Sequence, residues 1–389
     1  MYLLYFLYFC THINSFYFII VPNADGGKSL FFLYNMTSQQ ILLTTFSFLP
    51  FVVCLFWFIC FIVQHGKTDA AKHFFTLYIA TCTVLYLCHA LFFTVGLSYE
   101  MECLWTLCSL SVYPLFYGYL CRLTSSSYTL LQLVPWLVPG AVVAVAKYAL
   151  PDAGIDRVRL LLFTIQVGTV CFFGIRKLKA FDKRLQMVYA DTEGRDTTAV
   201  HHLLLAIIFI SVLAGAANSI GKHFFGESLW LLIPISLAFS TMLFALSFIC
   251  FNRDFTIDEF DIDYNEETDY RESSVQDNIE LIGKKIDELM VEQHYFLKKD
   301  LKIGDLVKEI GSNRTYVSTY INRTHNSSFS DYTNSLRIEY AKNLLLTSPV
   351  NTKLTIIAEK SGYSSEQSFY RNFKKFAGMT PAEWIAKQH

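Results

Sequence analysis

Long apolar runs are the feature that most constrains what this chain can fold into. From residue 41 the sequence holds seven such runs, each about long enough for a helix to cross the roughly 30 Å hydrocarbon core of a bilayer. They lie at about 41–63, 74–97, 103–121, 129–150, 158–175, 202–220 and 229–251. None carries the charged stripe that a helix of a soluble protein shows to water. We therefore expect an all-α protein in which residues 36–251 form a polytopic transmembrane bundle of about seven spans.

The first 35 residues leave the number of spans open. The stretch "MYLLYFLYFCTHINSFYFIIV" is apolar and about long enough for an eighth span. It lacks the basic start and the small-residue cleavage site of a signal peptide. Alternatively, the segment lies upstream of the true start, and the working protein begins at Met36. We favour the second interpretation and treat residues 1–35 as an apolar extension whose role stays open.

The short loops between the runs predict the orientation of the bundle. Lys and Arg in such loops stay on the cytoplasmic side of the membrane. The odd-numbered loops carry nine basic residues and the even-numbered loops carry three. We therefore expect the odd loops and everything after Phe251 to be cytoplasmic. The loop at 98–102, which contains two glutamates, is expected to be external. The pattern predicts a multi-pass membrane protein with its C-terminal domain on the cytoplasmic side.

Charge separates the rest of the chain into two further regions. Residues 252–280 carry 11 acidic and 2 basic residues, whereas residues 281–389 carry 11 acidic and 16 basic ones. All ten cysteines lie before residue 252, which suits a cytoplasmic C-terminal part. We interpret residues 252–276 as an acidic, solvated linker and residues 277–389 as a separate basic domain.

The motifs that would indicate an enzyme or a cofactor site fail on inspection. In "DGGKS" (25–29), Pro22 stands where a phosphate-binding P-loop needs glycine. "DIDYNEETDYRE" (261–272) resembles a calcium loop, but Glu266 occupies the position of the glycine that makes the sharp turn. The sequence contains no nucleophile elbow, kinase loop or zinc motif. We therefore expect no enzymatic activity, no metal and no cofactor.

The basic domain shows the pattern of two helix–turn–helix units. "NIELIGKKIDELM" has apolar residues three or four apart, which predicts an amphipathic helix. "KIGDLVKEIG" and "SNRTYVSTYINRT" then form a helix pair, with Asn313 as a plausible N-cap. A longer helix covers about residues 329–346. "LTIIAEKSG", a turn at Gly362 and "SSEQSFYRNFKKF" form the second pair.

These residues resemble a known family. Residues 279–386 are similar to the DNA-binding domain of AraC-type transcription regulators, and "LTIIAEKSGYSSEQSFYRNFKKFAGMTPAEW" matches the family motif closely, as does the linking "LRIEYAKNLL". The first unit departs more. Ile321 and Asn322 stand where members often have Phe-Lys, and Asn326 stands where they often have glycine.

The resemblance implies which side chains contact DNA. Inward-facing residues are Val317 and Ile321 in the first unit and Phe369 and Phe373 in the second. Arg and Gln are suited to guanine and adenine edges, and Lys to phosphates. By alignment with the motif, the base candidates are Arg314, Thr315, Ser318, Thr319, Glu366, Gln367, Ser368 and Arg371. The phosphate candidates are Asn322, Arg323, Lys374 and Lys375.

An AraC-type domain behind a multi-span region resembles a membrane-bound one-component regulator. The resemblance implies a location in the inner (cytoplasmic) membrane of a bacterium. The expected function is sequence-specific binding of double-stranded DNA, controlled by a signal molecule sensed in the membrane region. Expected partners are double-stranded DNA, the lipid bilayer, RNA polymerase and an unknown signal molecule, with a homodimer left open. The alternative is a membrane transporter with a cytoplasmic regulatory DNA-binding domain. Substrate flux that survives deletion of residues 277–389 would favour that alternative.

Overall fold

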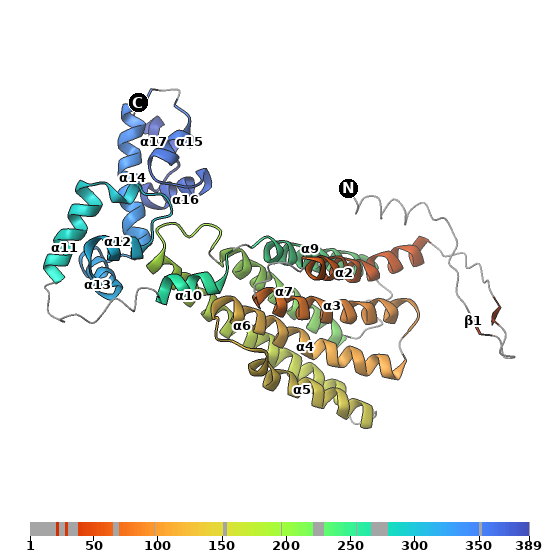
Figure 1. The fold of residues 1–389 in the computed structure, drawn as a ribbon. Coiled ribbons are helices and arrows are strands. Elements are labelled where there is room, and N and C mark those ends of the chain that lie inside the picture. The colour runs from red at the N-terminus through yellow and green to blue at the C-terminus, as the bar shows by residue number, and fades with distance from the viewer. Residues whose placement is uncertain are drawn as a thin grey trace. The chain divides into compact units, whose positions relative to one another are not determined.

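The computed structural model is nearly all helical and divides into two compact units (Figure 1). The first unit comprises Met1–Arg122, Tyr128–Gly174 and Val200–Asn252. The second comprises Leu123–Ser127, Ile175–Ala199 and Arg253–His389. The structure describes residues 21–22, 28–29, 38–64, 70–96, 98–150, 154–195, 197–220, 229–253, 255–265, 279–349 and 352–388.

The described helices of the N-terminal region follow the predicted apolar runs closely. They are α2 (Ser38–Val63), α3 (Ala70–Thr94), α4 (Tyr99–Thr124), α5 (Leu130–Ala149), α6 (Ile155–Val188), α7 (Thr198–Ile220) and α9 (Leu229–Phe251). Ahead of them, β1 (Val21–Pro22) pairs with β2 (Lys28–Ser29) in a short antiparallel ladder. The expectation of a helical fold is therefore confirmed apart from this ladder.

Six of these helices are long and apolar enough to cross a membrane: α2, α3, α4, α5, α6 and α9. The seventh predicted run coincides with α7, which contains a shorter described apolar stretch, Thr198–Phe209. The described residues thus support six spans, and the predicted number of seven stays a prediction. The possible eighth span falls on residues 1–35, nearly all of which lie outside the described ranges.

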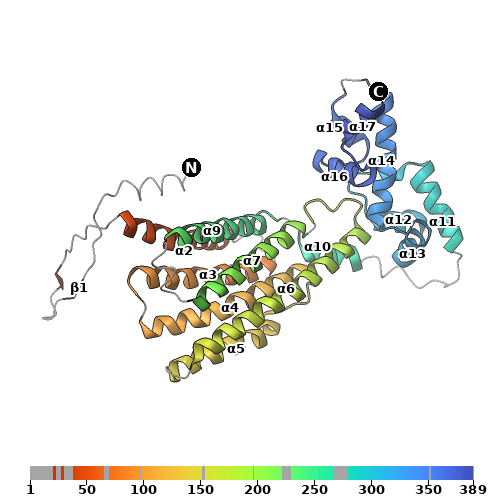
Figure 2. The same ribbon diagram turned by 180° about the vertical axis from the view of Figure 1, so that it is seen from behind.

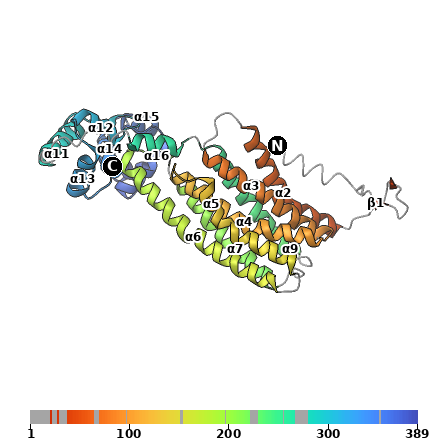
Figure 3. The same ribbon diagram turned by 60° about the horizontal axis from the view of Figure 1, so that its bottom comes forward.

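The surface of the helical bundle is apolar, as expected for helices in contact with lipid. Large hydrophobic side chains such as Val63, Leu131 and Trp230 are almost fully exposed. A soluble protein rarely shows so much apolar surface. By contrast, most of α4 is buried inside the bundle, where Figure 3 shows it among its neighbours.

Aromatic and small residues bring the helices together. Trp57 of α2 lies 5.2 Å from Phe244 and 5.5 Å from Phe251 of α9, measured between ring centroids. Gly140 of α5 lies so close to α4 that an added Cβ would come within 2.9 Å of Leu110 Cβ. Dense packing of this kind replaces the hydrophobic effect as the main cause of helix association in lipid.

Charged side chains gather where α4, α5 and α6 meet at one end of the bundle. Lys147 is buried, and its Nζ lies 3.3 Å from Glu102 and 3.0 Å from Asp156. Arg159 also pairs with Asp156, at 3.3 Å, and lies 4.6 Å from the ring centroid of Trp105. Pairing of this kind is what allows charges to be buried away from water.

Two parts of the second compact unit differ from the sequence-based expectations. The fifth loop, expected after residue 175, is helical at its start, because α6 continues to Val188. The acidic segment 252–276, expected to be a solvated linker, contains helix α10 (Ile257–Asn265). Ile257 and Phe260 of α10 pack against Phe181 and neighbouring side chains of α6. Part of this segment therefore has a buried apolar face.

The remaining helices of the second compact unit form the C-terminal domain, seen from behind in Figure 2. They are α11 (Ile279–Asp287), the π-helical turn η1 (Glu288–Glu292), the 3-10 turn η2 (Tyr295–Leu297), α12 (Ile303–Ile310), α13 (Arg314–His325), α14 (Phe329–Thr347), α15 (Leu354–Lys360), α16 (Glu366–Ala377) and α17 (Pro381–Gln388). The expected pair of helix–turn–helix units joined by one longer helix, α14, is present.

Candidate DNA interface

Each helix–turn–helix unit has its own hydrophobic core. In the first unit, Val317 and Ile321 of α13 are fully buried in a cluster with Leu306 and Val307 of α12. In the second unit, Phe369 and Phe373 of α16 are fully buried. The four inward-facing positions expected from the sequence are thus confirmed. Because one face of each recognition helix is fixed in a core, the opposite face is held in a defined orientation.

Hydrogen-bonded caps fix the ends of both recognition helices. Asn313 accepts a hydrogen bond from Tyr316 N at 3.0 Å, which confirms it as the N-cap of α13. Ser365 accepts one from Ser368 N at 3.0 Å and caps α16 in the same way. At the other end of α13, Asn326 adopts a left-handed conformation with φ of 47°. Asparagine tolerates this conformation, so it replaces the glycine of the family motif without loss of the turn.

The linking helix α14 connects the two units through a buried arginine. Arg337 is fully buried and donates hydrogen bonds of 2.8 Å to the carbonyl oxygens of Phe296 and Lys298. Its guanidinium lies 5.3 Å from the ring centroid of Tyr363, in the turn of the second unit. Burial lowers the pKa of Arg337 and raises the pKa of Tyr363. The arrangement joins elements of both units around α14, and so limits how far the units can move independently.

The base candidates of the first unit lie in the first two turns of α13. Thr315 is exposed, and the other three are partly exposed: Arg314, Ser318 and Thr319. The phosphate candidates Asn322 and Arg323 are exposed near the end of the same helix. The polar face predicted from the sequence is therefore accessible along the first recognition helix.

The candidates of the second unit fall into two groups. Glu366 and Gln367 are exposed in the first turn of α16, and Lys374 and Lys375 are exposed in its last turn. Glu366 accepts a hydrogen bond from Thr355 Oγ1 at 2.9 Å, so its carboxylate is partly used within the unit. Lys375 pairs with Asp331 at 2.6 Å.

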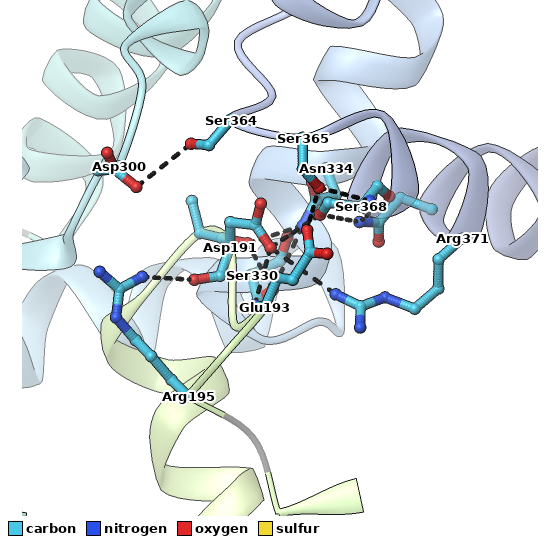
Figure 4. Close-up of polar contacts among 12 residues, drawn as sticks. Asp191, Glu193, Arg195, Asp300, Ser330, Asn334, Ser364, Ser365, Ser368 and Arg371 are labelled. Atoms are coloured by element: carbon cyan, nitrogen blue, oxygen red, sulfur yellow. Dashed lines mark hydrogen bonds and ion pairs between the residues drawn. The ribbon is translucent and has the colours of Figure 1, made fainter. Parts of the chain in front are cut away.

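The other two candidates, Ser368 and Arg371, are engaged by a segment far away in the sequence. This segment, which we call the acidic loop, comprises residues 190–195 between α6 and α7 and belongs to the same compact unit as the C-terminal domain. Ser368 is fully buried and donates a hydrogen bond of 2.8 Å to Asp191 Oδ1. Arg371 lies 3.7 Å from the same oxygen, with half of its side chain exposed. Figure 4 shows both carboxylates of the loop directed toward α16.

The acidic loop is anchored on both sides of α14. Its backbone joins the first unit, because Ala190 N donates to Leu301 O at 2.9 Å. Ala190 O accepts hydrogen bonds of 2.8 Å from Ser330 and Asn334 of α14. Glu193 accepts a hydrogen bond from Ser365, the N-cap of α16. The sequence analysis missed these residues, although Asp191 and Glu193 are acidic exceptions in the most basic loop of the chain.

The match to a known family covers the C-terminal domain. Residues 306–387 match the family model described as a helix-turn-helix domain. The chain is 32% identical over 91 residues to the uncharacterised HTH-type transcriptional regulator YtdP of Bacillus subtilis, and 38% identical over 66 residues to the porin thermoregulatory protein EnvY of Escherichia coli. An uncharacterised HTH-type transcriptional regulator of Staphylococcus aureus is 34% identical over 94 residues.

These matches concern a limited part of each protein. They span 23%, 17% and 24% of this chain, and 12%, 25% and 12% of YtdP, EnvY and the Staphylococcus aureus regulator, respectively. Among solved structures, a protein of unknown function from Listeria innocua is 32% identical, covering 26% of this chain and 94% of its own, with a TM-score of 0.24. The match to the family model and to the regulators named above identifies the C-terminal domain as an AraC-type helix–turn–helix domain.

Proposed function

We propose that this chain, whose residues 306–387 form an AraC-type helix–turn–helix domain, is a membrane-bound one-component transcription regulator. It binds duplex DNA in a sequence-specific manner, and a signal received by the membrane region controls that binding. The observation that carries the proposal is the combination of two recognition helices, α13 and α16, with six apolar helices in one chain.

The geometry of the domain supports DNA reading by both units. The two recognition helices are connected through one linking helix, α14, and its buried Arg337. Two such helices on one scaffold suit successive major grooves on one face of the duplex, about one helical turn apart. Exposed Lys374, Lys375 and Arg323 are suited to the phosphates on either side of the grooves.

The orientation of the membrane region follows from this proposal. The DNA-binding domain must be in the cytoplasm, which agrees with the bias of basic residues toward the odd-numbered loops. Reporter domains fused after Asn252 and within residues 98–102 test the orientation. We expect cytoplasmic activity for the first fusion and external activity for the second. External activity after Asn252 would contradict both the orientation and the DNA-binding function.

Genome-wide mapping of DNA bound by the full chain in living cells tests the function itself. We expect a limited set of sites that share a bipartite sequence, and we expect occupancy to change when the correct signal is supplied. A chain with Arg371→Ala serves as the control. The sites that it binds should share the sequence of only one half of the bipartite motif. Uniform occupancy that does not differ between the two chains would contradict sequence-specific regulation.

A further inference from the structure

We infer that the acidic loop is an autoinhibitory element that covers the recognition helix of the second unit. The inference rests on the proposed function, because it concerns the accessibility of that helix to DNA. It starts from the two side chains of α16 that the motif assigns to base edges and that the loop engages. Ser368 is 0% exposed beneath Asp191, so no base can reach it while the loop is in place.

Like the DNA backbone, the loop presents anionic oxygen atoms to α16. Asp191 presents a carboxylate oxygen to Ser368 and Arg371, and Glu193 accepts a hydrogen bond from the N-cap Ser365. The N-terminus of a helix attracts anions, because its first amides point outward and its dipole is positive there. An anionic loop and the anionic backbone of DNA therefore compete for the same end of α16.

The loop is built to hold its position. Asp182 of α6 accepts hydrogen bonds from both the backbone N–H, at 2.8 Å, and the hydroxyl of Thr197, which closes the base of the loop. Arg195 lies over the ring of Tyr189 at 4.6 Å and donates to Asp191 O at 3.2 Å. Glu193 N donates to Asp191 Oδ1 at 3.1 Å. The last of these bonds orients the Asp191 carboxylate without help from α16.

The position of the loop in the chain gives a route for control. It connects α6, a candidate membrane span, directly to α7. A signal that shifts the ends of these two helices would move the loop through the covalent chain. For such a signal to increase DNA binding, it must favour the state in which the loop is displaced from α16.

Neutralising the loop should raise DNA affinity. The full chain in detergent micelles would be prepared as wild type, as Asp191→Asn/Glu193→Gln and as the control Asp258→Asn/Glu259→Gln, which removes two exposed carboxylates from α10. Each of the three proteins is used to select from a randomised pool of duplexes of about 25 base pairs, long enough for two major grooves. The duplex with the highest enrichment in these selections is the probe for all three. We expect the loop variant to bind at least about tenfold more tightly than wild type, since it loses charge-assisted contacts, and the control to bind within about twofold.

Equal affinities for wild type and loop variant would overturn autoinhibition and leave DNA binding intact. Enrichment of no sequence by any of the three proteins would overturn the proposed function and this inference with it. A gain of the same size in the control would also overturn the inference, because it would show that loss of negative charge alone explains the effect.

A reversible lock provides an independent test. In Glu193→Cys/Ser365→Cys, oxidation would join the loop to the start of α16, and mass spectrometry would verify that bond against the native cysteines. We expect the oxidised double variant to bind the same probe at least about tenfold more weakly than its reduced form, with no redox effect in either single variant. Equal binding by the oxidised and reduced double variants would overturn the inference. Any loss of helix capping is common to both forms and cancels.

Discussion

In the first helix–turn–helix unit the turn glycine, Gly311, faces open space, whereas in the second unit Gly362 lies against the backbone of Leu297. Both adopt left-handed conformations, with φ of 69° and 83°. Apart from Gly311 itself and its two chain neighbours, no described residue has an atom within 4 Å of a Cβ added there, but a Cβ on Gly362 would lie 2.8 Å from Leu297 O and 3.1 Å from Arg337 Nε. Gly311 is thus required only for the backbone conformation of its turn, whereas Gly362 is also required for close packing against Leu297.

The recognition helices differ in a related way. The polar face of α13 is at least partly exposed at every base candidate, whereas Ser368 of α16 is buried beneath the acidic loop. The second unit is therefore tied both to the linking helix and to the loop, while the first keeps its polar face accessible. The inferred autoinhibition therefore acts on the second unit, where the loop buries the base candidate Ser368.

The largest effect that separates the two units should come from their turn glycines. In isolated residues 277–389, Gly362→Ala should lower the free energy of unfolding by about 2–5 kcal/mol, because backbone strain and overpacking combine. Gly311→Ala should cost about 1–2 kcal/mol from backbone strain alone. Urea unfolding followed by circular dichroism measures both values. Equal costs would show that the contact of Gly362 with Leu297 is relaxed without penalty.

The second effect concerns base reading by α16. In isolated residues 277–389, Arg371→Ala should cost about 1–3 kcal/mol of binding free energy and relax the sequence preference at one or two positions. In the full chain the loss should be smaller, because the substitution also removes the ion pair with Asp191 that holds the loop. Selection from a randomised duplex pool, followed by binding measurements, compares the two forms. An unchanged preferred sequence would exclude Arg371 as a base contact.

Arg314 offers the matching test in the first unit. Arg314→Ala should relax the preference in the other half of the site, about 10 base pairs from the half read by α16. Its effect should be the same in the full chain and in isolated residues 277–389, since the hydrogen bond between the acidic loop and the first unit goes to Leu301, ahead of α12, and its side-chain contacts described above go to α16. Changes by Arg314→Ala and Arg371→Ala at the same positions would contradict the two-groove arrangement.

Much of this architecture follows from local patterns in the sequence. The apolar runs predicted the helices of the bundle, and the spacing of Val317, Ile321, Phe369 and Phe373 predicted both cores. Asn313 was recognisable as an N-cap because its side chain acts on its own helix. Such features depend on neighbours three or four residues away, which a single sequence displays directly.

The features that could not be predicted depend on contacts between distant residues. Asp191 and Ser368 are 177 residues apart, and nothing in the local pattern of either residue indicates the other. The helical extension of α6 was hidden because its many Lys and Arg residues suggested a loop, although both are good helix formers. Helix α10 was overlooked for the same reason, since its acidic residues obscured the buried Ile257 and Phe260.

The smallest effect we expect comes from Lys375, which should position DNA without reading it. Lys375→Ala should weaken the binding of isolated residues 277–389 to all sequences alike and make the slope of log affinity against log salt about 0.9 less steep. Its cost should be below that of Lys374→Ala, because Lys375 must give up its 2.6 Å ion pair with Asp331 to contact a phosphate. An exposed pair of this kind contributes roughly 0.2–1 kcal/mol. Titrations of a selected and a scrambled duplex at several salt concentrations measure these differences, and a variant that lost affinity only for the selected duplex would show that Lys375 reads sequence.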